Sequence, residues 1–241
     1  PVLYLKYRLT GKAVHNHIKH LVIDEMQDYS YLQYEILGML FSCPMTILGD
    51  KAQTMDTKIQ DVTKFLPAIF GKDIRRIEMN KSYRNTEPIA AYAASLTGET
   101  DAELFARDGD AVEMRNFSSR EETLSFVADA FSKEADTTET ASLLFLTEAE
   151  AKAAYRRLEK LFDEKGLSKE QLSYIDRNSN YFHTGLTVTT FYLAKGLEFE
   201  TVYAVTAKDR TDELTNQARY IMATRAMHRL YICEEGKGEN E

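Results

Sequence analysis

The sequence predicts an α/β protein in which mostly parallel sheets are flanked by helices. Short apolar runs alternate with segments of helical spacing along most of the 241 residues. Continuous apolar strands that alternate with helices are typical of a parallel sheet covered on both faces. Hydrophobic residues make up 44% of the chain and charged residues 28%, a balance that suits a globular protein and excludes a disordered or collagen-like one.

Before residue 80, short apolar runs surround one helical pattern. Residues 21–23 and 46–48 are apolar runs that each lead to an acidic residue, and we predict a strand at each. Residues 31–41 lie between them and have helical spacing. Residues 3–8 have the pattern of the middle of a helix, and residues 74–79 are predicted to form a further strand.

After residue 80, helices and strands alternate. Pro88 stands near the first turn of a predicted helix, where proline is favoured. Ser119, with Glu122 three residues on, is typical of a helix start, and Gly166 is typical of a helix end. The predicted helices cover residues 88–96, 119–132, 149–165 and 212–228. The predicted strands cover residues 112–117, 143–146, 187–191, 201–205 and 230–233.

Charge and cysteine usage narrow the class of protein. Lys plus Arg number 30 against 38 for Asp plus Glu, a net charge of -8, so we expect no strongly basic nucleic-acid binder, although a local basic groove remains open. Cys43 and Cys233 give neither a disulfide framework nor metal-ligand spacing, which predicts a reducing, cytoplasmic setting. No apolar run approaches the roughly 20 residues of a membrane span, no signal peptide is visible, and no membrane partner is expected.

Two predicted strand ends carry acidic residues. One strand ends in Asp24 and Glu25, and the next leads to Asp50. The carboxyl ends of parallel strands meet at one sheet edge, which is where ligands bind. A carboxylate there can hold Mg²⁺, and an adjacent one can orient or deprotonate water, the division of labour that nucleotide hydrolysis needs. An isolated strand-end acid is more often a helix N-cap or part of a loop turn. Here three apolar residues precede the acid pair, and Gln27 and Asp28 follow shortly after it, which argues against that alternative.

Five segments resemble the motifs of superfamily 1 helicases of the UvrD/Rep/PcrA type. They follow the family's order and span residues 21–226, nearly the whole chain. LVIDEMQD at 21–28 resembles motif II, the Walker B segment. The segments that resemble motifs III to VI are LGDKAQ at 48–53, NKSYRN at 80–85, the stretch 187–199 ending in KGLEF, and YIMATRA at 220–226. One such segment alone is weak evidence, whereas five in order make the resemblance specific.

The resemblance implies a RecA-like P-loop NTPase that uses ATP and Mg²⁺. Asp24 would hold Mg²⁺, and Glu25 would activate the hydrolytic water. Gln27 and Gln53 would sense the γ-phosphate and couple it to movement along the strand. A local cap remains the alternative for Gln27.

In the second half of the chain the resemblance implies further nucleotide contacts. Tyr83 would stack on the adenine, and core packing is its alternative. Arg84 and Arg225 would contact the γ-phosphate and stabilise charge in the transition state. The alternatives are a surface salt bridge for Arg84 and, for Arg225, a solvated basic face shared with Arg219 and Arg229.

The KGLEF segment and the strand before it complete the implied site. Gly196 and Glu198 are assigned to the nucleotide, with Glu198 reaching the ribose or the interdomain cleft. Thr189 and Thr190 stand where the family contacts the nucleic-acid backbone or relays to it.

The sequence departs from the family at the Walker A loop. That loop requires Gly, four residues and then Gly-Lys-Ser/Thr, whose amides and lysine cradle phosphates. The nearest match, Gly11-Lys12-Ala13, lacks the earlier glycine and the hydroxyl residue. Because the family places Walker A before motif II, we expect it in a part that precedes Pro1, and we expect negligible ATP turnover from this chain alone.

Two further departures bear on the branch of the family. The stretch from Arg84 to Thr187 has room for a second RecA-like core but not for the extra 2B domain, an arrangement that resembles the helicase-IV/HelD-like branch. Gln53 is followed by Thr54, Met55 and Asp56, and the chain has no Trp. A stacking platform contributes roughly 1–3 kcal/mol per base, so its absence weakens the case for UvrD-type unwinding.

These observations lead to an explicit expectation for domains and function. Residues 1–80 would be the C-terminal part of a first RecA-like domain, and residues 81–241 a second RecA-like domain. The leading function is the C-terminal motor portion of an ATP-dependent superfamily 1 DNA helicase that translocates on single-stranded DNA or acts at a duplex junction. The alternatives are an ATP-driven RNA-polymerase-binding remodelling or recycling factor of the HelD-like type, and a non-enzymatic interaction module.

Overall fold

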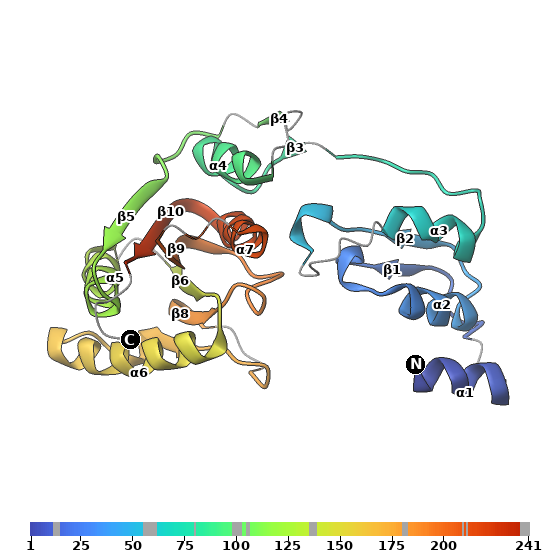
Figure 1. Cartoon of the computed structure of the whole chain (residues 1–241), viewed down its shortest axis with the longest axis horizontal. Coiled ribbons are helices and arrows are strands. Elements are labelled where there is room, and N and C mark those ends of the chain that lie inside the picture. The colour runs from blue at the N-terminus through green and yellow to red at the C-terminus, as the bar shows by residue number, and fades with distance from the viewer. Residues whose placement is uncertain are drawn as a thin grey trace. The chain divides into compact units, whose positions relative to one another are not determined.

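The computed structural model describes residues 1–11, 15–54, 62–79, 81–97, 103–104, 107–134, 139–179, 183–208, 210 and 212–236. The chain divides into two compact units, a first unit at Pro1–Glu78 and a second unit at Met79–Glu241 (Figure 1). Five residues named above, Lys12, Ala13, Met55, Asp56 and Asn80, lie outside the described ranges.

The first unit contains a small parallel sheet with helices beside it. Its described elements are α1 (Val2–Thr10), β1 (Leu21–Ile23), the 3-10 turn η1 (Met26–Asp28), α2 (Tyr31–Leu40), β2 (Met45–Ile47), the 3-10 turn η2 (Lys51–Gln53) and α3 (Val62–Phe70). β1 and β2 run parallel, with Ile23 opposite Ile47. Ile23 packs in a buried core with three side chains from α2 and α3, namely Tyr34, Val62 and Leu66. Both helices therefore cover the Ile23 face of the sheet.

Ser30 and Gln33 fix the start of α2. Ser30 Oγ accepts the Gln33 N–H at 3.4 Å, and Gln33 Oε1 accepts the Ser30 N–H at 2.8 Å, which is a capping box. One residue later, the buried Tyr34 donates its hydroxyl to the carbonyl of Met26 at 3.0 Å. α2 therefore holds in place the turn that follows β1, where the acidic residues lie.

The second unit contains a six-stranded, all-parallel sheet with the strand order β5-β10-β9-β6-β8-β7. The strands are β5 (Glu113–Phe117), β6 (Thr140–Phe145), β7 (Leu172–Tyr174), β8 (Gly185–Thr190), β9 (Phe199–Ala207) and β10 (Ala226–Glu235). The helices are α4 (Glu87–Thr97), α5 (Arg120–Glu134), α6 (Glu148–Lys165), the 3-10 turn η3 (Lys169–Gln171) and α7 (Glu213–Thr224). A separate short pair is formed by β3 (Lys81–Ser82) and β4 (Glu103–Leu104).

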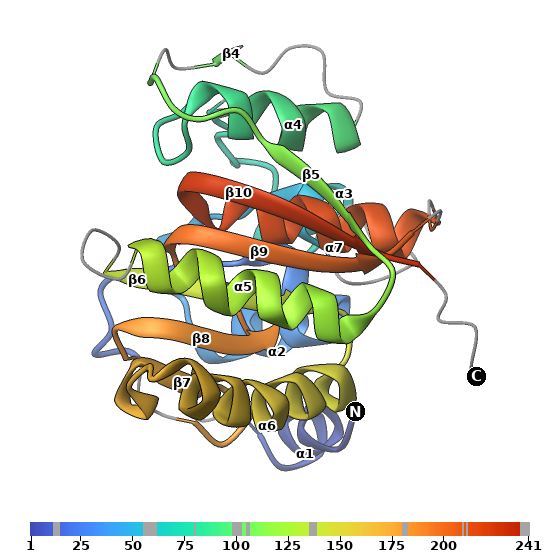
Figure 2. The same ribbon diagram turned by 90° about the vertical axis from the view of Figure 1, so that its left-hand side faces the viewer.

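Helices cover both faces of the six-stranded sheet. Successive residues of a strand point to opposite faces. In β9, Tyr203 and Val205 join the core formed with α5 and α6, whereas Val202 and Ala204 join the core formed with α4 and α7. Figures 1 and 2 show these helix pairs on opposite sides of the sheet. The predicted fold class, α/β with parallel sheets flanked by helices, is confirmed.

Local capping confirms two of the predicted helix boundaries. The Glu122 N–H donates to Ser119 Oγ at 3.3 Å, so Ser119 caps α5, although the Glu122 carboxylate reaches back to Ser118. At the end of α6, Gly166 adopts a φ of 70°, the left-handed conformation that glycine enters without steric cost.

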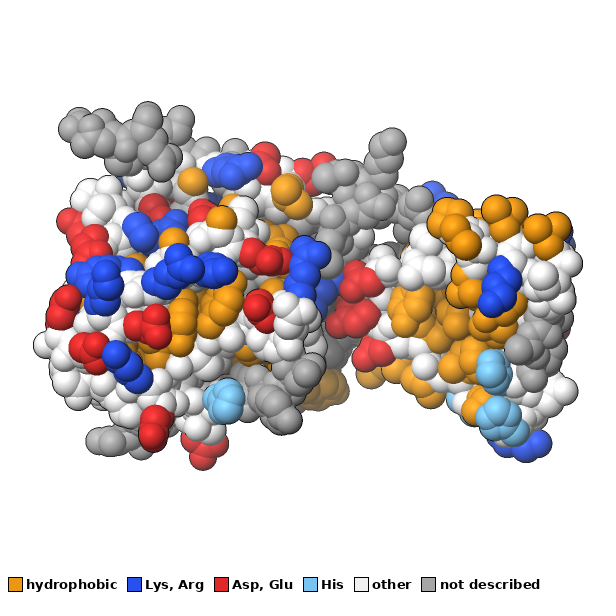
Figure 3. All heavy atoms as spheres, turned by 90° about the horizontal axis from the view of Figure 1, so that it is seen from below, with side chains coloured by type: hydrophobic (Ala, Val, Ile, Leu, Met, Phe, Trp, Pro, Cys, Tyr) orange, Lys and Arg blue, Asp and Glu red, His pale blue; other side chains and the backbone are white. Residues whose placement is uncertain are grey.

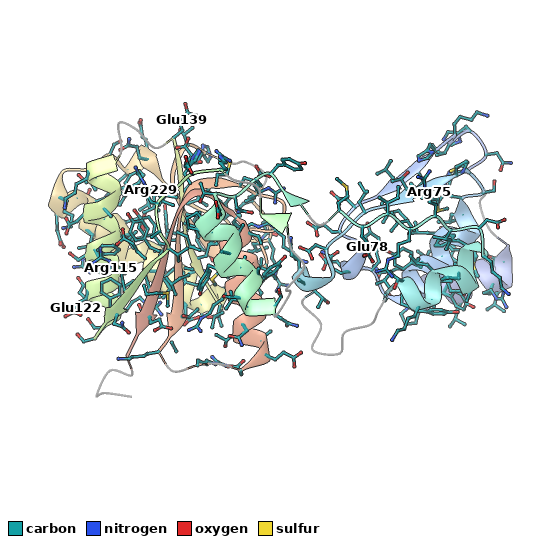
Figure 4. All side chains as sticks on the ribbon, turned by 90° about the horizontal axis from the view of Figure 1, so that it is seen from above. Arg75, Glu78, Arg115, Glu122, Glu139 and Arg229 are labelled. Atoms are coloured by element: carbon teal, nitrogen blue, oxygen red, sulfur yellow. The ribbon has the colours of Figure 1, made fainter. Side chains whose placement is uncertain are left out.

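Two of the predicted elements need correction, and one observed helix, α3, was not predicted. Residues 74–79 form no strand, and Ile77 and Met79 are 68% and 84% exposed. Arg75 and Glu78 are labelled in this segment in Figure 4. Strand preference expresses packing against neighbours, and no described strand pairs with these residues. The helix predicted over 212–228 ends at Thr224 because β10 begins at Ala226. α3 escaped prediction because Pro67, normally a helix breaker, stands inside it.

Candidate functional site

The acidic strand ends of the first unit lie side by side. The Leu48 N–H donates to the carbonyl of Ile23 at 2.8 Å, and the Met26 N–H donates to the carbonyl of Leu48 at 2.8 Å. The two chains therefore stay paired past the ends of β1 and β2. Asp24 and Asp50 follow their strands at the same, carboxyl edge of the sheet, as parallel pairing requires.

Glu25 has an unusual backbone conformation. Its φ of 52° and ψ of 50° lie in the left-handed region, and among the described residues it is the only non-glycine with positive φ. Such a conformation costs a non-glycine residue on the order of 1–2 kcal/mol. The Glu25 N–H donates to Asp24 Oδ1 at 2.8 Å, which supports the bend. The carboxylates of Asp24 and Glu25 therefore have different partners. Asp24 accepts the Glu25 N–H, whereas the Glu25 carboxylate accepts a hydrogen bond from the Gln27 side chain.

A chain of hydrogen bonds joins this turn to the segment after β2. Gln27 Nε2 donates to Glu25 Oε2 at 2.5 Å, and Gln27 Oε1 accepts the Asp50 N–H at 3.1 Å. Gln53 Nε2 then donates to Asp50 Oδ2 at 2.9 Å. Gln53 is 9% exposed. The structure thus brings together Glu25, Gln27 and Gln53, three of the predicted site residues, through Asp50.

Gly49 makes this close approach sterically feasible. A Cβ added at Gly49 would lie 2.5 Å from Gln27 Oε1 and 2.5 Å from Met26 Cγ, and 2.7 Å from the Met26 nitrogen. Those distances are far inside van der Waals contact. Only glycine therefore lets the β2 end run against the turn that carries Gln27.

Asp24 supplies an exposed carboxylate at this edge. Mg²⁺ prefers oxygen ligands, and it usually takes one or two carboxylates together with waters and substrate phosphates. Asp24 fits the role of one such ligand. No group of three or more His, Cys, Asp or Glu side chains that could hold a metal ion alone occurs among the described residues.

In the second unit, two arginines lie next to one loop. The Arg84 Nε and Glu198 Oε1 are 2.6 Å apart, and both side chains are about two-fifths exposed. Arg225 Nη1 donates to the carbonyl of Leu197 at 3.4 Å, and Arg225 Nη2 donates to Thr224 Oγ1 at 3.2 Å. The structure therefore brings Arg84, Glu198 and Arg225 together at the amino end of β9.

The exposure of each side chain tests the non-catalytic alternatives given above for Arg84, Arg225 and Tyr83. Arg225 is 2% exposed, so a solvated basic face is wrong for it. Tyr83 is 62% exposed, so core packing is wrong for that ring. Arg84 does form an ion pair, with Glu198 as its partner. Gly196 lies in the turn before Glu198 with a φ of 77°, and a Cβ there would meet open space.

Thr189 and Thr190 lie apart from this cluster. They end β8 at its carboxyl edge, whereas Glu198 immediately precedes the amino end of β9, which runs parallel. Thr189 is 0% and Thr190 1% exposed, and Thr189 Oγ1 donates to the carbonyl of Ile175 at 2.8 Å. A direct contact with a nucleic-acid backbone would require these hydroxyls to become exposed, whereas a relay through the strand would not.

Two residues near the arginines escaped sequence analysis as functional candidates. Asn85 Nδ2 donates to the carbonyl of Ala226 at 2.6 Å and lies 3.5 Å from the carbonyl of Thr224. Arg107 Nη1 donates to the carbonyl of Arg84 at 2.6 Å, and the Arg107 carbonyl accepts the first N–H of α4, from Glu87, at 2.9 Å. Asn85 belongs to the NKSYRN segment, which was the only available signal. Arg107 gave none.

Comparisons with known proteins bear on both units. Residues 4–55 match the sequence profile of the UvrD/REP helicase N-terminal domain. The C-terminal domain of a possible DNA helicase from Lactobacillus plantarum WCFS1 is 24% identical with a TM-score of 0.51, and the match covers 66% of this chain and 91% of that one. A variant of Dbp5 from S. cerevisiae, bound to RNA and ADP BeF3, is 13% identical with a TM-score of 0.52. That match covers 99% of this chain and 57% of that one, and no curated protein sequence matches the chain.

The structural likenesses show that the chain has the fold of RecA-like helicase domains. The profile match falls on β1, the acidic turn and the segment through Gln53. The chain therefore resembles the UvrD/REP helicase N-terminal domain over residues 4–55, while its membership of the HelD-like branch stays a prediction. None of the helices in the described part of the chain is long and apolar enough to cross a membrane.

Proposed function

We propose that this chain is the motor portion of an ATP-dependent superfamily 1 DNA helicase that couples ATP hydrolysis to translocation on single-stranded DNA. The observation that carries the proposal is the hydrogen-bond chain from Glu25 through Gln27 and Asp50 to Gln53. It links a strand-end acid pair to a second segment at the sheet edge where ligands bind in α/β folds. The match of residues 4–55 to the UvrD/REP helicase profile supports the same assignment.

The first unit would supply the hydrolytic residues. Asp24 would hold Mg²⁺, which when bound neutralises charge on the phosphates. Glu25 would orient the attacking water and accept its proton, since its carboxylate is fixed by Gln27 at 2.5 Å. Gln27 and Gln53 would detect the γ-phosphate, because a shift of either amide moves the other through Asp50.

The second unit would supply further groups that bind the nucleotide. The exposed ring of Tyr83 would stack on adenine, and Gly196 and Glu198 would face the ribose. Arg84 and Arg225 would neutralise the γ-phosphate. Arg225 is 2% exposed, so that contact requires its side chain to turn outward, and Arg84 would exchange Glu198 for phosphate.

We assign the two units to parts of two RecA-like domains; these 241 residues contain no Walker A pattern. The Dbp5 structure, which has the same fold, carries RNA and ADP BeF3, and this supports a nucleotide and a nucleic acid as the ligands here. Single-stranded DNA is the proposed partner, and ATP with Mg²⁺ the proposed cofactors.

The test is ATP turnover with and without single-stranded DNA, in a protein that joins this chain to a Walker A segment. Glu25→Gln should abolish turnover while nucleotide binding is kept. Glu78→Gln, the same change at an exposed position of the first unit, is the matched control and should turn over normally. Failure of the unsubstituted protein to hydrolyse ATP in either condition would exclude a motor and favour an interaction module. Turnover without DNA stimulation, together with capture of RNA polymerase, would favour the remodelling factor.

A further inference from the structure

Asn85 lies at the centre of the contacts that surround the two arginines. Arg84 and Asn85 are consecutive, and each bonds to a different partner. Arg84 pairs with Glu198, while the Asn85 amide bonds to the carbonyls on both sides of Arg225. Leu197, next to Glu198, accepts a hydrogen bond from the Arg225 guanidinium. These contacts form a closed ring, and Asn85 is the member that holds the backbone of Arg225.

The backbone that Asn85 holds is a helix end. Arg225 is the C-cap of α7, and the last carbonyls of a helix have no partner within the helix. Asn85 is 6% exposed, so it supplies the Thr224 and Ala226 carbonyls with a donor where water is largely excluded. On the other side, the carbonyl of Arg225 accepts the Phe199 N–H at 2.9 Å. The backbone of Arg225 is thus fixed from two directions.

Other contacts hold the turn on which Asn85 stands. The Arg107 guanidinium donates to the carbonyl of Arg84, and the Arg107 carbonyl accepts the first N–H of α4. A Cβ at Gly109 would lie 2.4 Å from Thr86 Cγ2, so the segment 107–110 packs tightly on this turn. The turn therefore has support that is independent of the Asn85 amide. Loss of that amide should act mainly at Arg225 and not on the turn itself.

We propose that Asn85 is a positioning residue that fixes Arg225 relative to Arg84, so that both guanidinium groups can reach one phosphate. This inference rests on the proposed function for its catalytic consequence, but the positioning itself does not. A displacement of about 1 Å at a catalytic group costs on the order of a hundredfold in rate, so fixed spacing between the arginines has kinetic value.

The first test measures positioning in the 241-residue chain without nucleotide. The Nε–H signal of Arg225 is assigned by NMR with Arg225→Lys, and its position and exchange with water are recorded. Asn85→Ala removes the amide, and Asn85→Asp keeps its shape but replaces the donor with an acceptor. Both should shift the signal and speed its exchange at least about tenfold. Asn116→Asp, at an exposed asparagine of β5, is the matched control and should change neither.

The second test measures turnover in the protein that includes a Walker A segment. Asn85→Ala should lower kcat on the order of ten- to a hundredfold, with a smaller change in KM. In an Arg225→Ala background the same substitution should lower kcat less than about twofold, because residues that act through one another are non-additive. An equal loss in both backgrounds would show that Asn85 has a merely structural role and would overturn the inference.

The two tests separate the inference from the function on which it rests. An unchanged Arg225 signal in both Asn85 variants overturns the positioning role, whatever the turnover. A shifted signal with normal turnover in Arg225→Ala supports the positioning role and removes Arg225 from the catalytic groups of the proposed function. If Asn85→Ala fails to fold, Asn85→Asp provides both measurements.

Discussion

The two units differ in how completely their sheets are covered. In the second unit, helices pack on both faces of six strands, and the two cores include fully buried side chains from every helix layer. In the first unit, the core lies on one face of two strands. Val22 on the other face is 59% exposed and Leu48 is 47% exposed. Figure 3 shows hydrophobic side chains gathered on the surface of this unit.

The comparison shows that the proposed hydrolytic residues and the arginines have scaffolds of unequal strength. Parallel strands are normally buried on both faces, and a sheet of two strands is at best marginally stable by itself. The acidic turn therefore depends on α2, α3 and a few hydrogen bonds. Arg225 stands between α7 and β10, which belong to the sheet that is covered on both faces, and Arg84 lies shortly before α4. The first unit should respond to small local changes, whereas the second should respond mainly to changes in its core.

The largest expected difference is in thiol reactivity, since each unit has one cysteine. Cys43 is partly exposed, whereas Cys233 on β10 is 0% exposed and burial raises the pKa of its thiol to about 12. Because the thiolate is the reactive form, Cys233 should react with a disulfide reagent at pH 8 at least about a thousandfold more slowly than Cys43. In denaturant, where neither side chain is buried, both cysteines should react rapidly and at similar rates. Similar native rates would mean that the second unit opens as readily as the first.

A core truncation should give the largest loss of stability. Leu158 of α6 is 0% exposed, and Leu158→Ala should lower the free energy of unfolding of the second unit by about 2–5 kcal/mol. Leu214→Ala on α7, where the side chain is 42% exposed, is the control and should cost less than about 0.5 kcal/mol. Denaturant unfolding with Cys233 labelling as the probe measures both. Equal effects would contradict the description of this core.

Gly49→Ala should break the first unit locally. The added Cβ would overlap Gln27 and Met26, and overpacking of this kind costs about 1–3 kcal/mol. Hydrogen exchange of the first-unit amides should quicken while second-unit amides are unchanged. Gly236→Ala, whose Cβ would meet its nearest atom at an ordinary 3.6 Å, is the control. Unchanged exchange rates of the first-unit amides in Gly49→Ala would show that the turn can accommodate the added Cβ.

The smallest effect should come from the cap of α7. The Thr215 hydroxyl and N–H both donate to Asp212, and this bonding holds the pKa of the Asp212 carboxyl below its ordinary value. A carboxyl with a depressed folded pKa stabilises the fold above its unfolded pKa, near 4, and that contribution is lost as the pH falls through the folded pKa. Asp212→Asn keeps a capping oxygen but cannot titrate.

The pH dependence of unfolding distinguishes the unsubstituted protein from Asp212→Asn. Between pH 7 and pH 3, the second unit of the unsubstituted chain should lose slightly more stability than that of Asp212→Asn. Thermal unfolding at several pH values measures the difference. Parallel curves for the two chains would mean that the charge on Asp212 does not contribute.

Local patterns predicted the second unit well because each signal lies within a few residues of its effect. Gly166 ends α6, and Ser119 starts α5, through bonds to near neighbours. The link from Asn85 to Ala226 spans 141 positions, and no local pattern shows it. The segment at 74–79 has the composition of a strand but no described neighbour to pair with. Sequence therefore predicted most of the elements and the acidic strand ends, while contacts between distant segments emerged only from the structure.

The left-handed backbone of Glu25 has a consequence for engineering. Glycine adopts this conformation without steric cost, so Glu25→Gly would relieve strain at that position. A screen that selects only for heat resistance would therefore favour loss of the residue assigned to water activation. Stabilised versions of this protein should be sought with position 25 held constant. Thermal stability favours glycine at this position, whereas the proposed ATP turnover requires glutamate.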